Sequence, residues 1–553
     1  MKTPPGISPA TFAAALKEFA GVVGKDWVFS SDEDLDLYRD SYSPVRGKPE
    51  ERTASAAVAP STSEEVQAIV KIANAHKIPL YTISTGKNLG YGGSAPAYSG
   101  SVVLDLKRMN RIIEVNDRNH YAIVEPGVSY FDLYNYIQEH DLKVWIDCPD
   151  PGWGSLIGNA LDHGVGATAG RYRNHIDAHC GMEVVLANGE VMRTGMGALP
   201  NAQTWAEFKN GFGPIIDGMF SQSNFGIVTK MGFWLMPAPE AFLEAKIHAQ
   251  RYGDLEGLVD ALNLIENSGI ATGLPEICSP LLGSGATYQQ IKFFRDGAPP
   301  MAAEHKKLLG EATNGFSPAL EQYGRDNDIP YWTLYLNFYG PAKVVAAQWE
   351  AAQEIASRAI KDLQFEAGPV LTFPLTDAQA ADLPLPHIGI PNLEIFVFGA
   401  RSQSNPHPTS GHMWFTPVIP RTGKAIIEAN QVFSEVLKRL NLPLGELNRF
   451  AMPFCLFERS FLFVIGFPVT EDPALNERLV AALREFIGIA AARGWAEYRT
   501  PVIFQDQVMS VYSYNNNALL RFHETIKDAI DPNGILSPGR YGIWPKHLRG
   551  NAR

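Results

Sequence analysis

Residues 84–93 read STGKNLGYGG and follow directly on IPLYTIS (78–84), an apolar run that predicts a β-strand. The loop is not a P-loop, because Lys87 lacks the upstream glycine pattern and is not followed by Ser or Thr. Its glycines at 86, 90, 92 and 93 do not fit G-x-G-x-x-G either. Its backbone amides, with few side chains in the way, would suit a pyrophosphate. By itself, however, the loop is an equally good strand-to-strand turn.

The first 240 residues around this loop alternate short β-rich runs with helical patterns. AAVAP (56–60) predicts a strand, and Thr62 with Glu65 predicts a capping box for the helix that follows. SVVLDL (101–106) and YAIVEPGVS (121–129) predict two further strands. This region is therefore α/β or α+β, with a loop that brings the backbone close to a ligand or to another segment.

From about residue 240 to 495 the pattern changes. The aromatic run YWTLYLNFYG (331–340) predicts a long strand, and residues 343–360 predict a helix. The same order returns with HMWFTPV (412–418), a helix near 421–440, the strand SFLFVIGF (460–467) and a helix near 475–492. We expect an antiparallel sheet covered by helices, which gives an α+β protein of two domains.

Composition and charge narrow the function classes. The chain has 553 residues, 45% hydrophobic and 19% charged, as is ordinary for a globular protein. Its net charge of −12, with no Lys/Arg-rich run, makes a nucleic acid or an anionic membrane an unfavourable main partner. No run approaches the roughly 18 apolar residues of a membrane span, and the first residues do not resemble a signal peptide. The four cysteines are far apart and predict no metal site. We expect a soluble, cytoplasmic protein.

Four further motifs follow the loop in order. They are SLIGN (155–159), the hairpin GMEVVLANGEVMRTG (181–195) with Asn188-Gly189 at its turn, SQSNFGIVTKMGFWLMP (221–237) and DPNGILSPGR (531–540). Together with the loop they resemble the flavoprotein family of vanillyl-alcohol oxidase and p-cresol methylhydroxylase, closest to the vanillyl-alcohol and eugenol oxidases. The resemblance covers almost the whole chain.

The resemblance implies a PCMH-type FAD-binding domain in residues 1–242, a cap domain in 243–496 and a C-terminal segment, 497–553, that returns to the FAD-binding domain. FAD is the implied cofactor. The residues implied at the cofactor are Thr85, Gly86, Lys87, Asn88, Gly90, Gly92, Ser155, Gly158, Asn159, Gly226, Ile227 and Arg540.

His412 lies in SGHMWFTP (410–417). Without context, one of thirteen histidines is an ordinary hydrogen-bonded or exposed side chain. The segment resembles the one that holds the flavin-linked histidine of vanillyl-alcohol oxidases, which implies FAD bound covalently through His412. Such a bond needs a neutral imidazole as nucleophile. The methylhydroxylase branch uses a tyrosine linkage instead, so His412 favours the oxidase branch.

Tyr91, Tyr498 and Arg499 are the candidate phenol-binding residues. Two phenols and a guanidinium suit a phenolate, whose formation at pH 7 from a phenol of pKa near 10 costs roughly 4 kcal/mol. The pattern alone favours Tyr91 as a turn residue and Arg499 as the partner of a carboxylate. The resemblance instead implies that all three contact the phenol.

Asp150 ends WIDCPD (145–150). A single acidic residue in a loop is usually solvated. The resemblance implies that Asp150 lies beside the reactive nitrogen of the flavin and acts as a base, with Asp147 as its rival. Two residues of the implied substrate pocket depart from the family. Ala167, in ATAG (167–170), replaces a tyrosine and predicts a larger pocket. Trp414 replaces a smaller aromatic residue, so the alternative is a pocket of unchanged volume that Trp153 and Trp414 refill.

The implied reaction is oxidation of 4-hydroxybenzyl alcohols, 4-alkylphenols, 4-allylphenols or lignin-derived phenols. Hydride leaves the para-benzylic carbon for the flavin and gives a p-quinone methide. Water activated by Asp150 adds to this intermediate, or the intermediate rearranges, and dioxygen is reduced to hydrogen peroxide. The expected partners are a small phenol, dioxygen and further copies of the chain in a homodimer or larger homo-oligomer. Two alternatives remain open: a dehydrogenase of the same fold that reduces a cytochrome or another acceptor, and a sugar or hydroxy-acid oxidase.

Overall fold

The computed structural model describes residues 3–149, 151–296, 300–380, 383–394, 411–442 and 450–552. The first sheet has the order β1-β2-β4-β3, with β4 parallel to both β2 and β3. Its strands are β1 (Val28–Phe29), β2 (Ala56–Val58), β3 (Leu80–Ile83) and β4 (Val102–Asp105). Val102 packs against α1 (Pro9–Val23) and α3 (Ser63–His76), whereas Val103 lies on the opposite face of the sheet. Both faces are covered, as a parallel sheet requires.

The start of α3 departs slightly from the predicted capping box. Thr62 Oγ1 accepts from the Glu65 amide at 3.2 Å, as expected. The Glu65 carboxylate, however, accepts from the amide of Ser61 at 2.6 Å, one residue before the N-cap. The side chain still satisfies an amide at the helix entry.

A second, antiparallel sheet has the order β5-β6-β10-β8-β9. Its strands are β5 (Ile112–Asn116), β6 (Tyr121–Val124), β8 (His179–Val185), β9 (Val191–Arg193) and β10 (Ile227–Trp234). The predicted hairpin turn between β8 and β9 is confirmed, because Gly189 has φ +84° and its amide donates to Leu186 O at 2.8 Å. The helices α4 (Tyr130–Glu139) and α5 (Leu156–Leu161) pack on this sheet.

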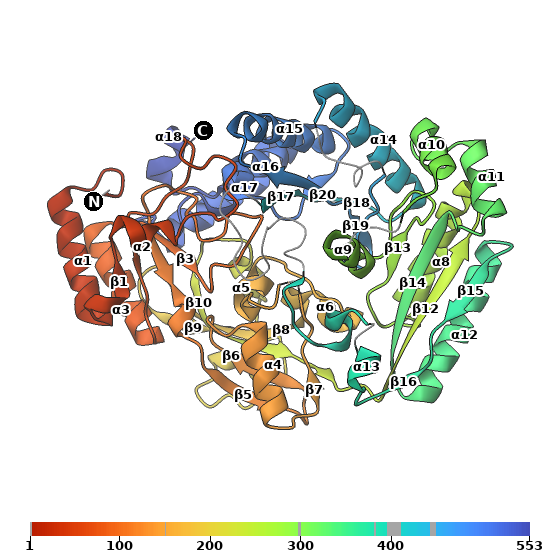
Figure 1. Cartoon of the computed structure of the whole chain (residues 1–553). Coiled ribbons are helices and arrows are strands. Elements are labelled where there is room, and N and C mark those ends of the chain that lie inside the picture. Colours follow the sequence, from red (N-terminus) through yellow and green to blue (C-terminus); the bar gives the residue numbers. More distant parts are fainter. Residues whose placement is uncertain are drawn as a thin grey trace.

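The cap sheet has the order β13-β14-β12-β15, and every pair is antiparallel. Its strands are β12 (Ala241–Ala249), β13 (Glu276–Cys278), β14 (Trp332–Gly340) and β15 (Gln364–Ala367), with β16 (Leu371–Thr372) also on β12. The helices α8 (Leu255–Asn267) and α12 (Ala342–Ala359) share one core with this sheet (Figure 1). The helices α9 (Thr287–Asp296), α10 (Ala303–Glu311) and α11 (Pro318–Asp326) complete this part of the cap. The predicted antiparallel sheet with helices is confirmed.

The run 460–467, predicted as one strand, forms parts of two. β19 (Ser460–Leu462) pairs with β18 (Pro417–Pro420), and β20 (Ile465–Val469) pairs with β17 (Gly411–Phe415). The partner strands β17 and β18 are themselves interrupted at Thr416, whose amide donates to the side-chain carboxylate of Glu497 at 3.2 Å. The helices α14 (Gly423–Leu440) and α15 (Pro473–Ala491) cover this region, and β21 (Ala496–Glu497) pairs with β18.

The C-terminal segment returns to the first sheet (Figure 1). After α16 (Gln505–Val511) and α17 (Tyr514–Ile530), Leu80 N donates to Ile535 O at 2.7 Å and Ser537 N donates to Leu80 O at 2.8 Å. The fully buried Lys527 holds this segment through Asp531 at 2.7 Å. The segment then runs parallel to β3 toward the glycine-rich loop, and Arg540 donates to Thr82 O at 3.0 Å. Within the described ranges, no helix is both long enough and apolar enough to cross a membrane.

Candidate active site

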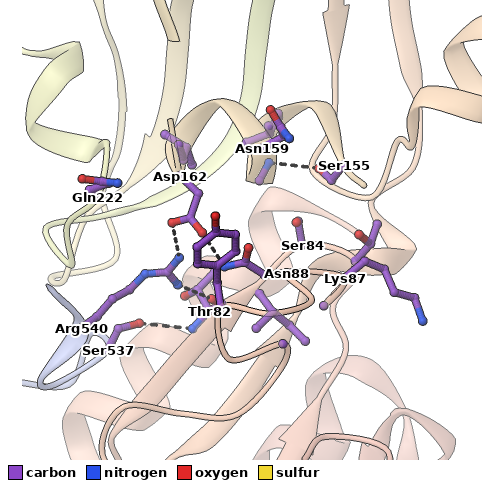
Figure 2. Close-up of a pocket in the computed structure, with 18 of the residues that line it drawn as sticks. Thr82, Ser84, Lys87, Asn88, Ser155, Asn159, Asp162, Gln222, Ser537 and Arg540 are labelled. Carbon is purple, nitrogen blue, oxygen red and sulfur yellow. Dashed lines mark hydrogen bonds and ion pairs between the residues drawn. The ribbon is translucent and has the colours of Figure 1, made fainter. Parts of the chain in front are cut away.

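One cavity lies between the N-terminal sheets and the cap strand β17. Its walls come from the loop after β3, from α5, from residues 220–228, from residues 536–541 and from the cap strand β17 with residues 499–505. Figure 2 shows side chains from several of these segments, with Lys87, Asn159, Gln222 and Arg540 in the same pocket. Stretches that are far apart in the sequence thus form one site.

Glycines allow these segments to approach one another. Gly86, Gly90, Gly92 and Gly93 all have positive φ, which glycine adopts without steric penalty. A Cβ on Gly158 would overlap Ser84 Oγ, so α5 reaches the end of β3 only because this residue has no side chain. A Cβ on Gly90 would lie 2.9 Å from the ring of His412. The glycines of the loop therefore let it pack against the cap and also let its backbone face the cavity.

The loop and its surroundings fit a phosphorylated ligand. Among the described residues, no oxygen accepts a hydrogen bond from the amides of Gly86, Lys87 or Asn88, all of which line the cavity. The charged lining residues are Lys87, Arg499 and Arg540 against the carboxylate of Asp162. The site is thus positive within a chain whose net charge is −12. Free amides and positive charge are what a pyrophosphate needs.

Most of the predicted cofactor residues line this cavity. They are Thr85, Gly86, Lys87, Asn88, Ser155, Gly158, Asn159, Gly226, His412 and Arg540. Gly90 and Gly92 do not line it; a Cβ on Gly92 would lie 3.0 Å from Val502, so both glycines serve packing. Ile227 is 1% exposed and packs in the core beside Val185. A strand residue next to Gly226 points away from the site that Gly226 lines.

His412 is buried in the cavity wall. Its ring lies between Tyr42, at 5.0 Å between centroids, and Trp414, at 4.2 Å. Burial lowers the pKa of His412 to about 3, so the imidazole is neutral at pH 7. Its Nδ1 has no hydrogen-bond partner among the described residues. A buried, neutral and unsatisfied imidazole at a cavity wall fits a group that bonds to a cofactor. Trp414 also lines the cavity, and its place in the substrate pocket stays a prediction.

The structure brings Tyr91, Tyr498 and Arg499 together. The Arg499 guanidinium lies 4.2 Å from the ring centroid of Tyr91 and 5.7 Å from that of Tyr498. Burial, more than the nearby Tyr498, raises the pKa of Tyr91 well above its usual value, so this phenol stays protonated and can donate a hydrogen bond. Burial alone would lower the pKa of Arg499, but Tyr498, Asp162 and Tyr91 outweigh it and raise the pKa. The site therefore holds a permanent positive charge beside a neutral hydroxyl.

The predicted base Asp150 lies outside the described residues. Its rival Asp147 is buried and does not line the cavity. Asp147 accepts from the Thr168 amide at 2.6 Å and contacts His175 Nε2 at 2.8 Å, which is a structural role. Ala167, next to Thr168, is half-buried and is not among the lining residues. The proposed enlargement of the pocket at Ala167 stays a prediction.

The sequence analysis names neither Asp162, which lines the cavity, nor Glu497, which lies outside the lining but next to Tyr498. Asp162 lines the cavity and contacts Asn88, Arg499, Arg540 and Tyr541. Glu497 precedes Tyr498, and burial raises its pKa to about 8. Its Oε1 has no partner among the described residues. No motif marks either residue, since their partners are distant in the sequence.

Comparison with known proteins agrees with this geometry. Residues 54–195 match the FAD binding domain family. The free amides, the positive lining and this match define an FAD-dependent oxidoreductase. The flavoprotein subunit of 4-cresol dehydrogenase [hydroxylating] from Pseudomonas putida is 35% identical over 545 residues, covering 98% of this chain and 97% of that protein.

Two solved structures are similar over nearly their whole length. One is 4-ethylphenol oxidase from Gulosibacter chungangensis in complex with isoeugenol, 33% identical with a TM-score of 0.80, covering 99% of this chain and 100% of that one. The other is p-cresol methylhydroxylase with substrate bound, also 33% identical with a TM-score of 0.80, covering 98% and 99%. The chain belongs to the family of vanillyl-alcohol oxidase and p-cresol methylhydroxylase, and its cofactor is FAD. The predicted family, fold class, enzyme class and cofactor are confirmed.

Proposed function

We propose that the protein oxidises para-substituted phenols at the benzylic carbon and binds them as phenolates. The observation that carries this proposal is the Arg499 guanidinium, which lies 4.2 Å from the Tyr91 ring centroid at the cavity wall. Tyr498 does not line the cavity, but its ring centroid lies 5.7 Å from the same guanidinium. Relatives named for 4-cresol and 4-ethylphenol support the same substrate class. A sugar or a hydroxy acid would have no need for this trio.

The trio offsets the cost of ionising the phenol. That cost is roughly 4 kcal/mol at pH 7. A buried guanidinium gives a charge-assisted hydrogen bond, roughly twice as strong as a neutral one. The Tyr91 hydroxyl can donate a second hydrogen bond to the phenolate, because its raised pKa keeps it protonated. FAD, when bound, supplies the acceptor for the hydride that leaves the benzylic carbon. The protein's part is to hold the phenolate charge and to keep water from screening it.

His412 is the proposed point of covalent attachment of FAD. Three observations support it: the ring lines the cavity, burial keeps it neutral, and its Nδ1 is unsatisfied among the described residues. The role of Asp150 as the base that activates water rests on the family resemblance alone.

Dioxygen is the proposed electron acceptor, with hydrogen peroxide as the product. The presence of a histidine where the methylhydroxylase branch links flavin through tyrosine favours the oxidase. The alternative acceptor is a protein, because the 35% identical relative is named as the flavoprotein subunit of a dehydrogenase. The homo-oligomeric state and the cytoplasmic location stay predictions.

The test compares 4-ethylphenol with its methyl ether. Under anaerobic conditions the phenol should bleach the flavin absorbance, and the methyl ether should not, because it cannot form a phenolate. Equal bleaching by both compounds would overturn the proposal.

Admitting air then identifies the acceptor. An oxidase should recover its flavin absorbance at once and release one hydrogen peroxide for each phenol oxidised. Recovery that needs an added cytochrome or artificial dye would instead establish a dehydrogenase.

A further inference from the structure

Asp162 is the only carboxylate among the described residues that line the cavity. It follows α5 and is 4% exposed. A buried carboxylate costs free energy unless it is paired and hydrogen-bonded. Figure 2 shows it facing Arg540 and Asn88, so it is part of the site and not of the surrounding core.

One set of contacts runs from Asp162 to the phenol-binding trio. Asn88 Nδ2 donates to Asp162 Oδ2 at 2.5 Å, and Arg499 donates to Asn88 Oδ1 at 2.5 Å. The guanidinium also lies 3.9 Å from the carboxylate itself. A carboxylate accepts only, so it fixes which end of the Asn88 amide faces it and leaves the oxygen for Arg499.

A second set of contacts runs from Asp162 to the C-terminal segment. Arg540 lies 3.5 Å from Asp162 Oδ1 and donates to Thr82 O at 3.0 Å. The hydroxyl of Tyr541 donates to the same carboxylate oxygen. Asp162 is thus the point where the glycine-rich loop, the cap-side Arg499 and the C-terminal Arg540 meet.

Two guanidinium groups around one carboxylate leave this cluster with a net positive charge, which favours an anionic ligand beside it. We propose that Asp162 is a positioning residue that holds Arg499, through Asn88, in the orientation that binds the phenolate, and that fixes Arg540 beside it. This inference rests on the proposed binding of phenols as phenolates.

The substitution Asp162→Asn separates positioning from charge, because the two effects have opposite signs. Removing a negative charge near an anion would by itself tighten phenolate binding. An asparagine can donate as well as accept, so it no longer fixes the Asn88 amide, and Arg499 loses its support. Positioning therefore predicts weaker phenolate binding, by roughly tenfold to a hundredfold, the effect of losing one hydrogen bond to a charged group.

The experiment titrates the FAD-loaded protein with 4-hydroxybenzaldehyde, a phenol whose ionised form absorbs at longer wavelength than its neutral form. The absorbance of the bound ligand reports its ionisation, and the titration gives Kd. The wild type should bind it ionised. The Asp162→Asn variant should bind it more weakly and with a smaller ionised fraction, which a general loss of stability would not produce.

Asp217→Asn is the matched control. Asp217 is 2% exposed and contacts His179 at 3.0 Å and Thr194 at 2.9 Å, but it does not line the cavity. This control should bind the ligand ionised, with the Kd of the wild type. Equal loss in both variants would overturn the positioning role of Asp162.

The remaining outcomes of the titration distinguish a failure of the positioning role from a failure of the proposed function. Unchanged or tighter binding of ionised ligand by Asp162→Asn would overturn the positioning role and leave the proposed function intact. Wild-type protein that binds only the neutral phenol would overturn the proposed function itself. If Asp162→Asn does not fold, Asn88→Ala keeps the carboxylate and removes the bridge, and it should show the same loss; unchanged binding there would refute the inference.

Discussion

Replacing Gly90 with alanine tests the contact between the glycine-rich loop and the cap strand β17. An added Cβ would lie 2.9 Å from His412 Cδ2 and 2.9 Å from Trp414 Cδ1. Gly90 also has φ +80°, a backbone conformation that alanine adopts only with strain. The two effects act together on the wall that holds the proposed flavin-linking histidine.

The magnitude follows from these two terms. A left-handed backbone at a residue with a side chain costs roughly 1–2 kcal/mol. Overpacking by one methyl group against two rings adds roughly 1–3 kcal/mol, because neither ring is a flexible chain end. We therefore expect Gly90→Ala to lower the free energy of unfolding by about 2–5 kcal/mol. The His412 ring should also shift by a few tenths of an ångström, which slows attachment of FAD.

Gly269→Ala is the control for the backbone term alone. Gly269 has φ +74°, and no atom lies within 4 Å of the position that an added Cβ would take. The assay compares urea midpoints of both variants and measures the flavin that stays with the protein after acid precipitation. Gly269→Ala should lose about 1–2 kcal/mol and keep its flavin. Equal destabilisation and equal flavin retention in the two variants would refute the packing of the loop against β17.

Three further predictions concern single side chains. His412→Ala should bind FAD but release it on acid precipitation, with turnover at least about tenfold lower; wild-type protein that releases all its flavin would disprove covalent attachment. Arg499→Ala should raise the transition-state free energy for a 4-alkylphenol by about 2–4 kcal/mol, seen as a matching fall in kcat/KM measured by peroxide release. A fall in kcat/KM of less than about threefold would show that Arg499 does not bind the phenol. Glu497→Gln should become more stable relative to the wild type as pH rises. The buried acid keeps its proton up to a pKa of about 8, whereas the unfolded chain loses it near 4.5, so the wild type loses stability between these values. Melting temperatures that differ by the same amount at pH 5 and pH 8 would contradict this.

Much of the fold follows from local sequence patterns. Alternating apolar runs, the Asn188-Gly189 turn and the capping residue Thr62 each act within a few neighbouring residues, so their effect is visible in the sequence. The same holds for the glycine-rich loop, because positive φ and close backbone approach restrict the residue type at each position. The family resemblance supplied what these patterns could not, namely that Tyr91, Tyr498 and Arg499 belong to one site.

Only the tertiary structure shows that Asp162 belongs to the site and that Ile227 and Asp147 do not line it. Asp162 joins Asn88, 74 residues away, to Tyr541, 379 residues away, and no local pattern encodes such a contact. The same long-range packing places Ile227 in the core, ties Asp147 to Thr168 and interrupts the strand at 460–467 opposite Thr416. The physical reason is that burial and charge pairing depend on which segments meet in space, whereas turns, caps and strand periodicity depend on neighbours along the chain.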